Sequence, residues 1–276
     1  MNLNPVKKLG ARVFDAVGIN SLGYFIQRAF FSPFIRIVNY HNLTQEMVPN
    51  FDEHLKYFSS RYVNVNRDQL EDFLDTGKWP HKKPGILLSF DDGMRSHSEI
   101  VVPMLNKYGF TGWFFVPSGW VFDVDGVPRE LPDTVGGNIV LSHAQLRHLD
   151  QDHLVGCHSE THNRLAENLG PERLKYETIG AKESLGKLLE HPVDMFCWVG
   201  GEEESYSKTA SDYIRQAYKL GFMMNMSIVR PGTDRFQLQR NNIEGDYPLW
   251  LVRFQISGIM DVVYYPKRKR VNKLTK

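Results

Sequence analysis

The chain has 276 residues, of which 42% are hydrophobic and 24% charged, as in a folded globular protein with a full core. Its net charge of +1 gives no electrostatic basis for nucleic-acid binding, so we expect no nucleic-acid partner. The two cysteines, Cys157 and Cys197, are too few for a disulfide framework, and we expect both as buried thiols.

The first 36 residues form an apolar segment before the first predicted strand. Its longest uncharged stretch, residues 16–27, is too short to span a membrane, and Asp15 interrupts a signal-peptide pattern. Residues 13–36 fit an amphipathic segment on a membrane surface, and they fit a helix packed on the domain's own outside equally well. We therefore expect a cytoplasmic protein or one peripheral at the inner membrane, without a cleavable signal peptide.

Strands and helices alternate along the next part of the chain, which predicts one α/β domain with a parallel sheet. The expected strands are 35–41, 85–90, 112–116, 154–158, 195–199, 222–228 and 236–240. The expected helices are 51–60, one that starts at Asn66, 96–108, 142–149, 171–190, and 206–220 closed by Gly221. Gln69 and Gln145 complete capping boxes with Asn66 and Ser142. Residues 120–140 are typical of a long loop beside a site.

Two short motifs place carboxylates and imidazoles at the ends of predicted strands. The first is Ser89-Phe90-Asp91-Asp92-Gly93, and the second is His158-Ser159-Glu160-Thr161-His162. Each motif alone is weak, because an Asp-Asp-Gly turn and a satisfied core histidine are both common. Together they lie where α/β folds build their sites. One carboxylate and two imidazoles make an open metal site, and the other carboxylate is free to act as a base.

These motifs resemble those of the polysaccharide deacetylases with the NodB-homology domain, carbohydrate esterase family 4. The resemblance runs over about residues 37–255 and rests on the family motifs T-F-D-D-G and H-[ST]-x-x-[HS]. It implies a distorted (β/α) barrel of about seven parallel strands that removes acetyl groups from N-acetylated sugars. It also implies a divalent metal, usually Zn²⁺, although the ligand types admit Co²⁺, Ni²⁺, Mn²⁺ or Fe²⁺. By this resemblance Asp92, His158 and His162 are the metal ligands and Asp91 is the general base.

The third family motif, R-x-P-[YF], is replaced here by Phe196-Cys197-Trp198-Val199-Gly200-Gly201, which is similar to the F-x-[YW]-P-x-G of envelope-polysaccharide members. Trp198 is a candidate sugar-stacking wall, with a core aromatic as the alternative, and Gly200 is a candidate backbone donor for the oxyanion. Arg240 resembles the Arg of an L-P-R segment in the same subgroup, and we expect it to replace the missing Arg as the partner of Asp91.

The fifth motif, L-x-H, has no counterpart, because no histidine follows His191. The Tyr-His pair at the end of the first predicted strand recurs in the envelope-polysaccharide subgroup. His41 is therefore our candidate for the general acid, and a structural histidine is the alternative. We expect Tyr40 to point away from the site into the core.

The last residues are strongly basic, with six Lys or Arg and no acid in 267–276. Removing these six from the 33 basic residues leaves 27 against 32 acidic ones, so the rest of the chain is net negative. Such a tail binds anionic lipid or another polyanion, or is a solvated, disordered terminus. The predicted organisation is an apolar segment at 1–36, the barrel at 37–265 and the basic tail at 266–276.

The sequence therefore predicts a metal-dependent hydrolase that removes acetyl groups from N-acetylated residues of a surface polysaccharide or its lipid-linked precursor. Peripheral membrane contact would involve residues 13–36 and 267–276. An amidase acting on a non-carbohydrate acetamide is one alternative. A catalytically impaired, glycan-binding relative is the other, because the third-motif Arg and the fifth-motif His are absent. The sequence makes no prediction of the oligomeric state.

Overall fold

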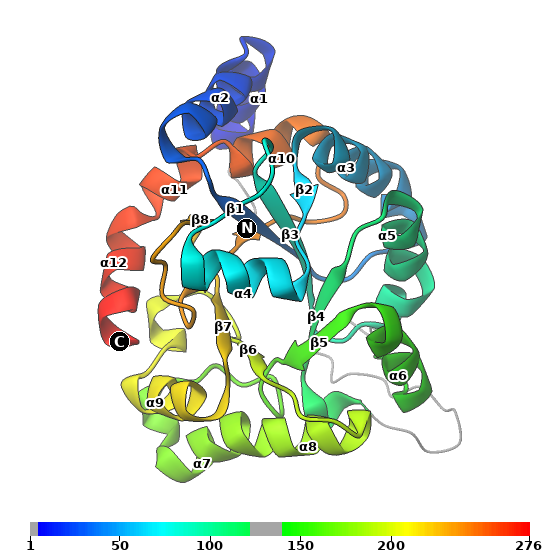
Figure 1. Ribbon diagram of the computed structural model, residues 1–276, viewed down its shortest axis with the longest axis vertical. Coiled ribbons are helices and arrows are strands. Elements are labelled where there is room, and N and C mark those ends of the chain that lie inside the picture. Colours follow the sequence, from blue (N-terminus) through cyan, green and yellow to red (C-terminus); the bar gives the residue numbers. More distant parts are fainter. Residues whose placement is uncertain (1–4, 122–139) are drawn as a thin grey trace.

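The computed structural model describes residues 5–121 and 140–276, in which a curved parallel sheet is surrounded by helices (Figure 1). The parallel strands are β1 (Ile35–Tyr40), β3 (Gly85–Asp91), β4 (Gly112–Val116), β5 (Leu154–Cys157), β6 (Met195–Cys197), β7 (Leu220–Met223), β9 (Leu238–Gln239) and β10 (Asn241–Asn242). Two short strands lie beside this path, β2 (Val63–Asn64) parallel to β3 and β8 (Ile228–Val229) antiparallel to β1.

The sheet closes on itself through residues 238–242. On one side β9 pairs with β7, with Leu238 opposite Phe222, and on the other β10 pairs with β1, with Asn241 opposite Val38. Only Arg240 separates β9 from β10, so one extended segment fills the seventh position of the barrel. The predicted barrel of about seven parallel strands is confirmed.

Alternation along the strands divides the apolar core into two layers. One layer fills the barrel and includes Ile37, Leu87, Phe115, Met195, Phe222 and Leu238. The other lies between the sheet and the helices and includes Val38, Leu88, Phe114, Phe196 and Trp198. At the carboxyl ends of β3, β5 and β9, polar residues take over from the apolar layer that fills the barrel. These polar residues form the candidate site.

Helices cover the outside of the barrel. They are α3 (Val48–Arg61), α4 (Arg67–Thr76), α5 (Val102–Tyr108), α6 (His143–Asp152), α7 (Pro171–Lys175), α8 (Ala181–Leu189), α9 (Lys208–Ala217), α10 (Leu249–Ile256), α11 (Ile259–Val263) and α12 (Tyr265–Leu274). Both predicted capping boxes, at Asn66 and Ser142, are confirmed. One turn of π-helix precedes α5, and another joins α7 to α8, so two predicted helices are interrupted.

The prediction that Gly221 closes the helix at 206–220 is wrong. Helix α9 ends at Ala217, because Tyr218 is already extended, and Gly221 lies inside β7. Its place there has a steric reason, since a Cβ at this position would lie 2.8 Å from the carbonyl oxygen of Phe236. The glycine therefore allows close packing of β7 against the segment that precedes β9.

Helices α1 (Pro5–Ala16) and α2 (Ile19–Phe31) precede the barrel, and α12 follows it. Of the two interpretations of residues 267–276, the disordered terminus is wrong, because Tyr265–Leu274 form the helix α12. Val271 and, just after the helix, Thr275 are buried, and Gln237 donates hydrogen bonds to Thr275 Oγ1 and to the Asn272 carbonyl. Most of the predicted loop at 120–140 lies outside the described residues. Both cysteines are buried and unbridged, as expected. Among the described residues, no helix has the length and hydropathy needed to cross a bilayer.

Candidate active site

Three side chains from the ends of β3 and β5 converge in the arrangement expected of metal ligands. His162 Nε2 lies 3.0 Å from Asp92 Oδ1, and His158 Nε2 lies 3.6 Å from the same oxygen. This oxygen is buried and accepts no hydrogen bond from the described residues. An unsatisfied carboxylate oxygen that faces two imidazole nitrogens suits a divalent cation such as Zn²⁺. The residues therefore fit the metal that the sequence predicts.

The backbone turns sharply where these side chains leave the strands. Asp92, Ser159 and His162 have φ of 76°, 61° and 59°, in the left-handed region that non-glycine residues rarely occupy. Such conformations cost roughly 1–3 kcal/mol each and cluster at functional sites. Because the chain turns at Asp92, the consecutive carboxylates of Asp91 and Asp92 can both contribute to one site.

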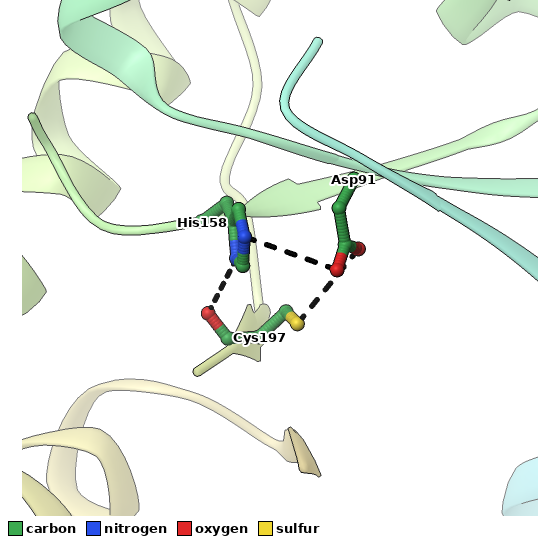
Figure 2. A group of neighbouring side chains, drawn as sticks. All are labelled: Asp91, His158 and Cys197. Atoms are coloured by element: carbon green, nitrogen blue, oxygen red, sulfur yellow. Dashed lines mark hydrogen bonds and ion pairs between the residues drawn. The ribbon is translucent and has the colours of Figure 1, made fainter. Parts of the chain in front are cut away.

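His158 is held as a neutral imidazole with its Nε2 lone pair facing the candidate metal site. Its Nδ1 donates a hydrogen bond of 2.9 Å to the backbone carbonyl of Cys197, which leaves Nε2 without a proton (Figure 2). Burial lowers the pKa of His158 to about 4, although the nearby Asp91 carboxylate acts in the opposite direction. A neutral imidazole fixed through its second nitrogen is the usual state of a metal-binding histidine.

Asp91 is bound by Arg240. The two terminal nitrogens of Arg240 donate to the two carboxylate oxygens of Asp91 at 2.7 and 2.8 Å, and one of them also contacts Asn39 Oδ1 and Ser89 Oγ. Burial alone would raise the pKa of Asp91, but the guanidinium holds it below its usual range. Asp91 is therefore ionised, oriented and close to the candidate metal ligands, with 3.8 Å between its Oδ2 and His158 Nε2.

A second trio of possible ligands, Asp91, His158 and Cys197, occupies the adjoining space (Figure 2). It suits a metal less well, because Arg240 already occupies both oxygens of Asp91. Burial also raises the pKa of the Cys197 thiol well above its ordinary value, so the sulfur stays protonated. The trio of Asp92, His158 and His162 is the better metal site.

His41 stands at the end of β1 and pairs with Glu244. Its Nδ1 lies 3.3 Å from Glu244 Oε1, and its side chain is 35% exposed. Burial lowers the pKa of His41, but Glu244 and the carboxylates of Asp92 and Asp91 outweigh it and raise this pKa to about 9. His41 therefore carries a proton at neutral pH, as a general acid must. Tyr40 is fully buried in the core, as expected.

The prediction that Trp198 forms a sugar-stacking wall is corrected by the structure. Its side chain is only 1% exposed and packs against Phe196 and Tyr206. The alternation of β6 explains this position: Met195 and Cys197 face the barrel interior, so Phe196 and Trp198 face the helices. Trp198 is thus the core aromatic of the alternative interpretation. Gly200 has φ of 77°, and its predicted role as an oxyanion donor stays a prediction.

Glu177 was not predicted from the sequence, yet it holds the turn that carries His162. It is fully buried on the π-helical turn between α7 and α8. Its carboxylate accepts hydrogen bonds from the backbone N–H groups of Glu160 and Thr161 at 3.1 and 2.9 Å, and from the side chains of Thr161 and Asn163. No motif marks Glu177 or Glu244; only three-dimensional contact reveals them.

Comparison with known proteins gives one family and a consistent fold. The polysaccharide deacetylase family model matches residues 78–223. The chain is similar to the Streptococcus pyogenes deacetylase PplD, solved in complex with acetate, with 22% identity, a TM-score of 0.64, and coverage of 80% of this chain and 98% of that one. It is also similar to IcaB from Ammonifex degensii, with 21% identity, a TM-score of 0.63, and coverage of 82% and 98%. No curated protein matches the sequence. At these identities the structural neighbours support the fold.

Proposed function

This chain belongs to the polysaccharide deacetylase family, whose model covers more than half of it, and we propose that it deacetylates a surface polysaccharide or its lipid-linked precursor. It is a hydrolase of the amide bond, a carbohydrate N-deacetylase. The observation that carries the proposal is the fully buried Arg240–Asp91 pair beside Asp92, His158 and His162. The surface-polysaccharide substrate follows from the resemblance of the segments at 196–201 and 237–240 to envelope-polysaccharide members.

The residues divide the reaction between them. A divalent metal, Zn²⁺ first among the candidates, would be held by Asp92, His158 and His162, and would supply Lewis-acid polarisation and a water of lowered pKa. Asp91, ionised and fixed by Arg240, takes a proton as water adds to the acetamide carbonyl. The Gly200 N–H is the proposed donor to the resulting oxyanion.

Breakdown of the tetrahedral species requires a proton on the leaving nitrogen. We assign this step to His41, whose pKa of about 9 keeps it protonated at neutral pH. The C–N bond then breaks, and acetate and the free amine leave. The hypothesis of a catalytically impaired binder rested on the missing third-motif Arg and the missing fifth-motif His. The first of these no longer supports it, because Arg240 gives Asp91 a cationic partner.

Peripheral membrane contact through residues 13–36 and 267–276 belongs to the proposal, as does a location in the cytoplasm or at the inner membrane. The division into an apolar segment at 1–36, a barrel at 37–265 and a basic segment at 266–276 is also part of it.

The direct experiment incubates the zinc-loaded protein with oligomers of N-acetylhexosamine that differ in linkage, and measures the acetate released. We expect release from at least one oligomer and a loss of release in Asp91→Asn. If no oligomer yields acetate, or if Asp91→Asn works at the wild-type rate, the proposal is wrong. A matched variant, Asp212→Asn on the exposed side of α9, should be unaffected.

A further inference from the structure

Helix α2 presents its apolar side to solvent and its polar side to the barrel. Its buried residues are Asn20, Tyr24 and Gln27, and the Gln27 side chain donates to the Ile256 carbonyl and accepts from Arg36. Its exposed residues include Leu22, Phe25, Ile26 and Phe30, with exposed fractions of 43–76%. This is the reverse of a normal surface helix, whose apolar stripe faces the core. The exposed apolar side of α2 therefore indicates a contact with an apolar partner.

The same apolar surface continues onto α11 and the start of α12. Val262, Val263 and Tyr265 are 74%, 61% and 55% exposed. A groove of about 640 Å³ separates them from α2, and its apolar lining includes Ile26 and Phe31. Helices α2, α11 and α12 follow one another along one side of the molecule (Figure 1). They form one face, which we call the α2–α12 face.

A basic cleft adjoins this groove. It also has a volume of about 640 Å³, and it shares Ser227, Ile228, Tyr265 and Arg268 with the groove. Lys269 and Lys273 line it from one side of α12, Lys276 lines it just beyond the end of that helix, and all three are exposed. In the part of the chain that the structure describes, no ion pair joins these lysines to an acidic side chain. The acidic residue of the lining, Asp234, is itself paired with Arg215.

We propose that the α2–α12 face binds the surface of an anionic phospholipid bilayer, an inference that rests on the peripheral membrane contact of the proposed function and gives it a face and a lipid. The apolar side chains of α2 would insert among the acyl chains, and Lys269, Lys273 and Lys276 would contact lipid phosphates. Apolar side chains next to unpaired cations match the boundary between acyl chains and anionic headgroups. A second copy docked through the same face would cover the apolar residues but would bring its own lysines, and no anionic surface, to those of the first.

This face lies away from the candidate active site. Helix α2 leads into the amino end of β1, whereas Asp92 and His158 follow the carboxyl ends of β3 and β5. Substitutions on the face therefore leave the metal ligands and Asp91 untouched. Membrane binding and deacetylation of a soluble oligomer can be measured independently of each other.

The test is flotation of the full chain with vesicles of phosphatidylcholine, with and without phosphatidylglycerol. We expect binding that requires phosphatidylglycerol and weakens with salt. Leu22→Glu with Phe30→Glu should abolish it. Lys269→Gln with Lys273→Gln should weaken partition roughly 25-fold, or about fivefold per cation, since each contributes about 1 kcal/mol at an anionic surface.

Matched controls lie on α7, on α8 and on the turn between them. Lys175→Gln with Lys187→Gln removes two exposed lysines there, and Tyr176→Glu places a charge at an exposed aromatic; neither should change vesicle binding. The proposal is overturned if the wild-type protein stays off anionic vesicles or if the Leu22 and Phe30 variant still binds. It is also overturned if lipid-free protein forms a dimer that this variant disrupts while no vesicle binding occurs, because the occupant is then a second copy. Acetate release from soluble oligomers should be equal in all variants.

Discussion

Arg240 donates hydrogen bonds to both carboxylate oxygens of Asp91, a residue 149 positions earlier in the sequence. The arginine sits between β9 and β10, in the segment that joins the two edges of the sheet. Closure of the barrel and orientation of the proposed base therefore depend on the same stretch of chain. The side chains of Arg240 and Asp91 are 0% and 2% exposed, so each buried charge is compensated mainly by the other.

The first prediction concerns Arg240→Lys, which keeps the positive charge but loses the bidentate hydrogen bonding to Asp91. Asp91 must be ionised to act as a base, and Arg240 lowers its pKa, so weakening the pair raises that pKa. We expect the acidic limb of the pH–rate profile to move to higher pH, and kcat to fall by about 10²-fold as the carboxylate loses its orientation. Acetate release measured against pH checks this.

The control for this variant is Arg67→Lys. Arg67 makes the same paired contacts with Asp194, at 2.7 and 2.8 Å, on a partly exposed surface at the amino end of β6, whereas the site lies at the carboxyl ends of the strands. Its replacement should leave the pH–rate profile unchanged. An acidic limb that does not move in Arg240→Lys would show that Asp91 is not the titrating base.

The second prediction concerns Glu244→Gln. Glu244 raises the pKa of His41, and an acid works only below its pKa, so activity is lost as pH rises through that value. Removing the carboxylate lowers the pKa of His41, and the alkaline limb of kcat/KM should move to lower pH. Glu190→Gln, which breaks an exposed pair with Arg147, is the control. If the alkaline limb stays in place, His41 is not the acid.

The third prediction concerns Glu177→Ala. The loss of four hydrogen bonds to residues 160–163 should loosen the turn that carries His162. We expect zinc affinity to fall about 10- to 100-fold, as when other residues that support metal ligands are removed. Competition with a chelator measures it. Glu183→Ala, on the exposed side of α8, should have no effect on zinc affinity. Equal zinc affinity in both variants would show that Glu177 does not support the turn that carries His162.

The fourth prediction concerns Trp198→Ala. Because Trp198 is a core residue, the change should lower the free energy of unfolding by about 3–5 kcal/mol. KM for an oligomeric substrate should stay near the wild-type value at temperatures where the variant is folded. A raised KM with unchanged stability would restore Trp198 as a sugar contact.

Local signals in the sequence predicted much of the fold. Apolar runs located β3 and β4, and the spacing of Asn66 and Gln69 located the start of α4, because strand burial and helix capping are decided by neighbours in the chain. The same logic placed Asp91 and His158 at strand ends. The family motifs then indicated which residues share the site.

Long-range features were harder to predict. The barrel closes through two strands of two residues each, too short for any periodic pattern, so only the resemblance pointed to Arg240. For Trp198 the sequence left a sugar-stacking wall and a core position open, and the structure places it in the core. Glu177 and Glu244 act through contacts between distant segments, which no spacing rule reveals.

In the proposed site Asp92, His158 and His162 hold the metal, whereas Asp91 does not. The most direct test of this assignment is the zinc content of Asp92→Asn and Asp91→Asn after equal loading and dialysis, measured by elemental analysis. We predict that Asp91→Asn keeps the wild-type stoichiometry and that Asp92→Asn loses most of its zinc. Full zinc in Asp92→Asn, or loss of zinc in Asp91→Asn, would show that the assignment of the metal ligands is wrong.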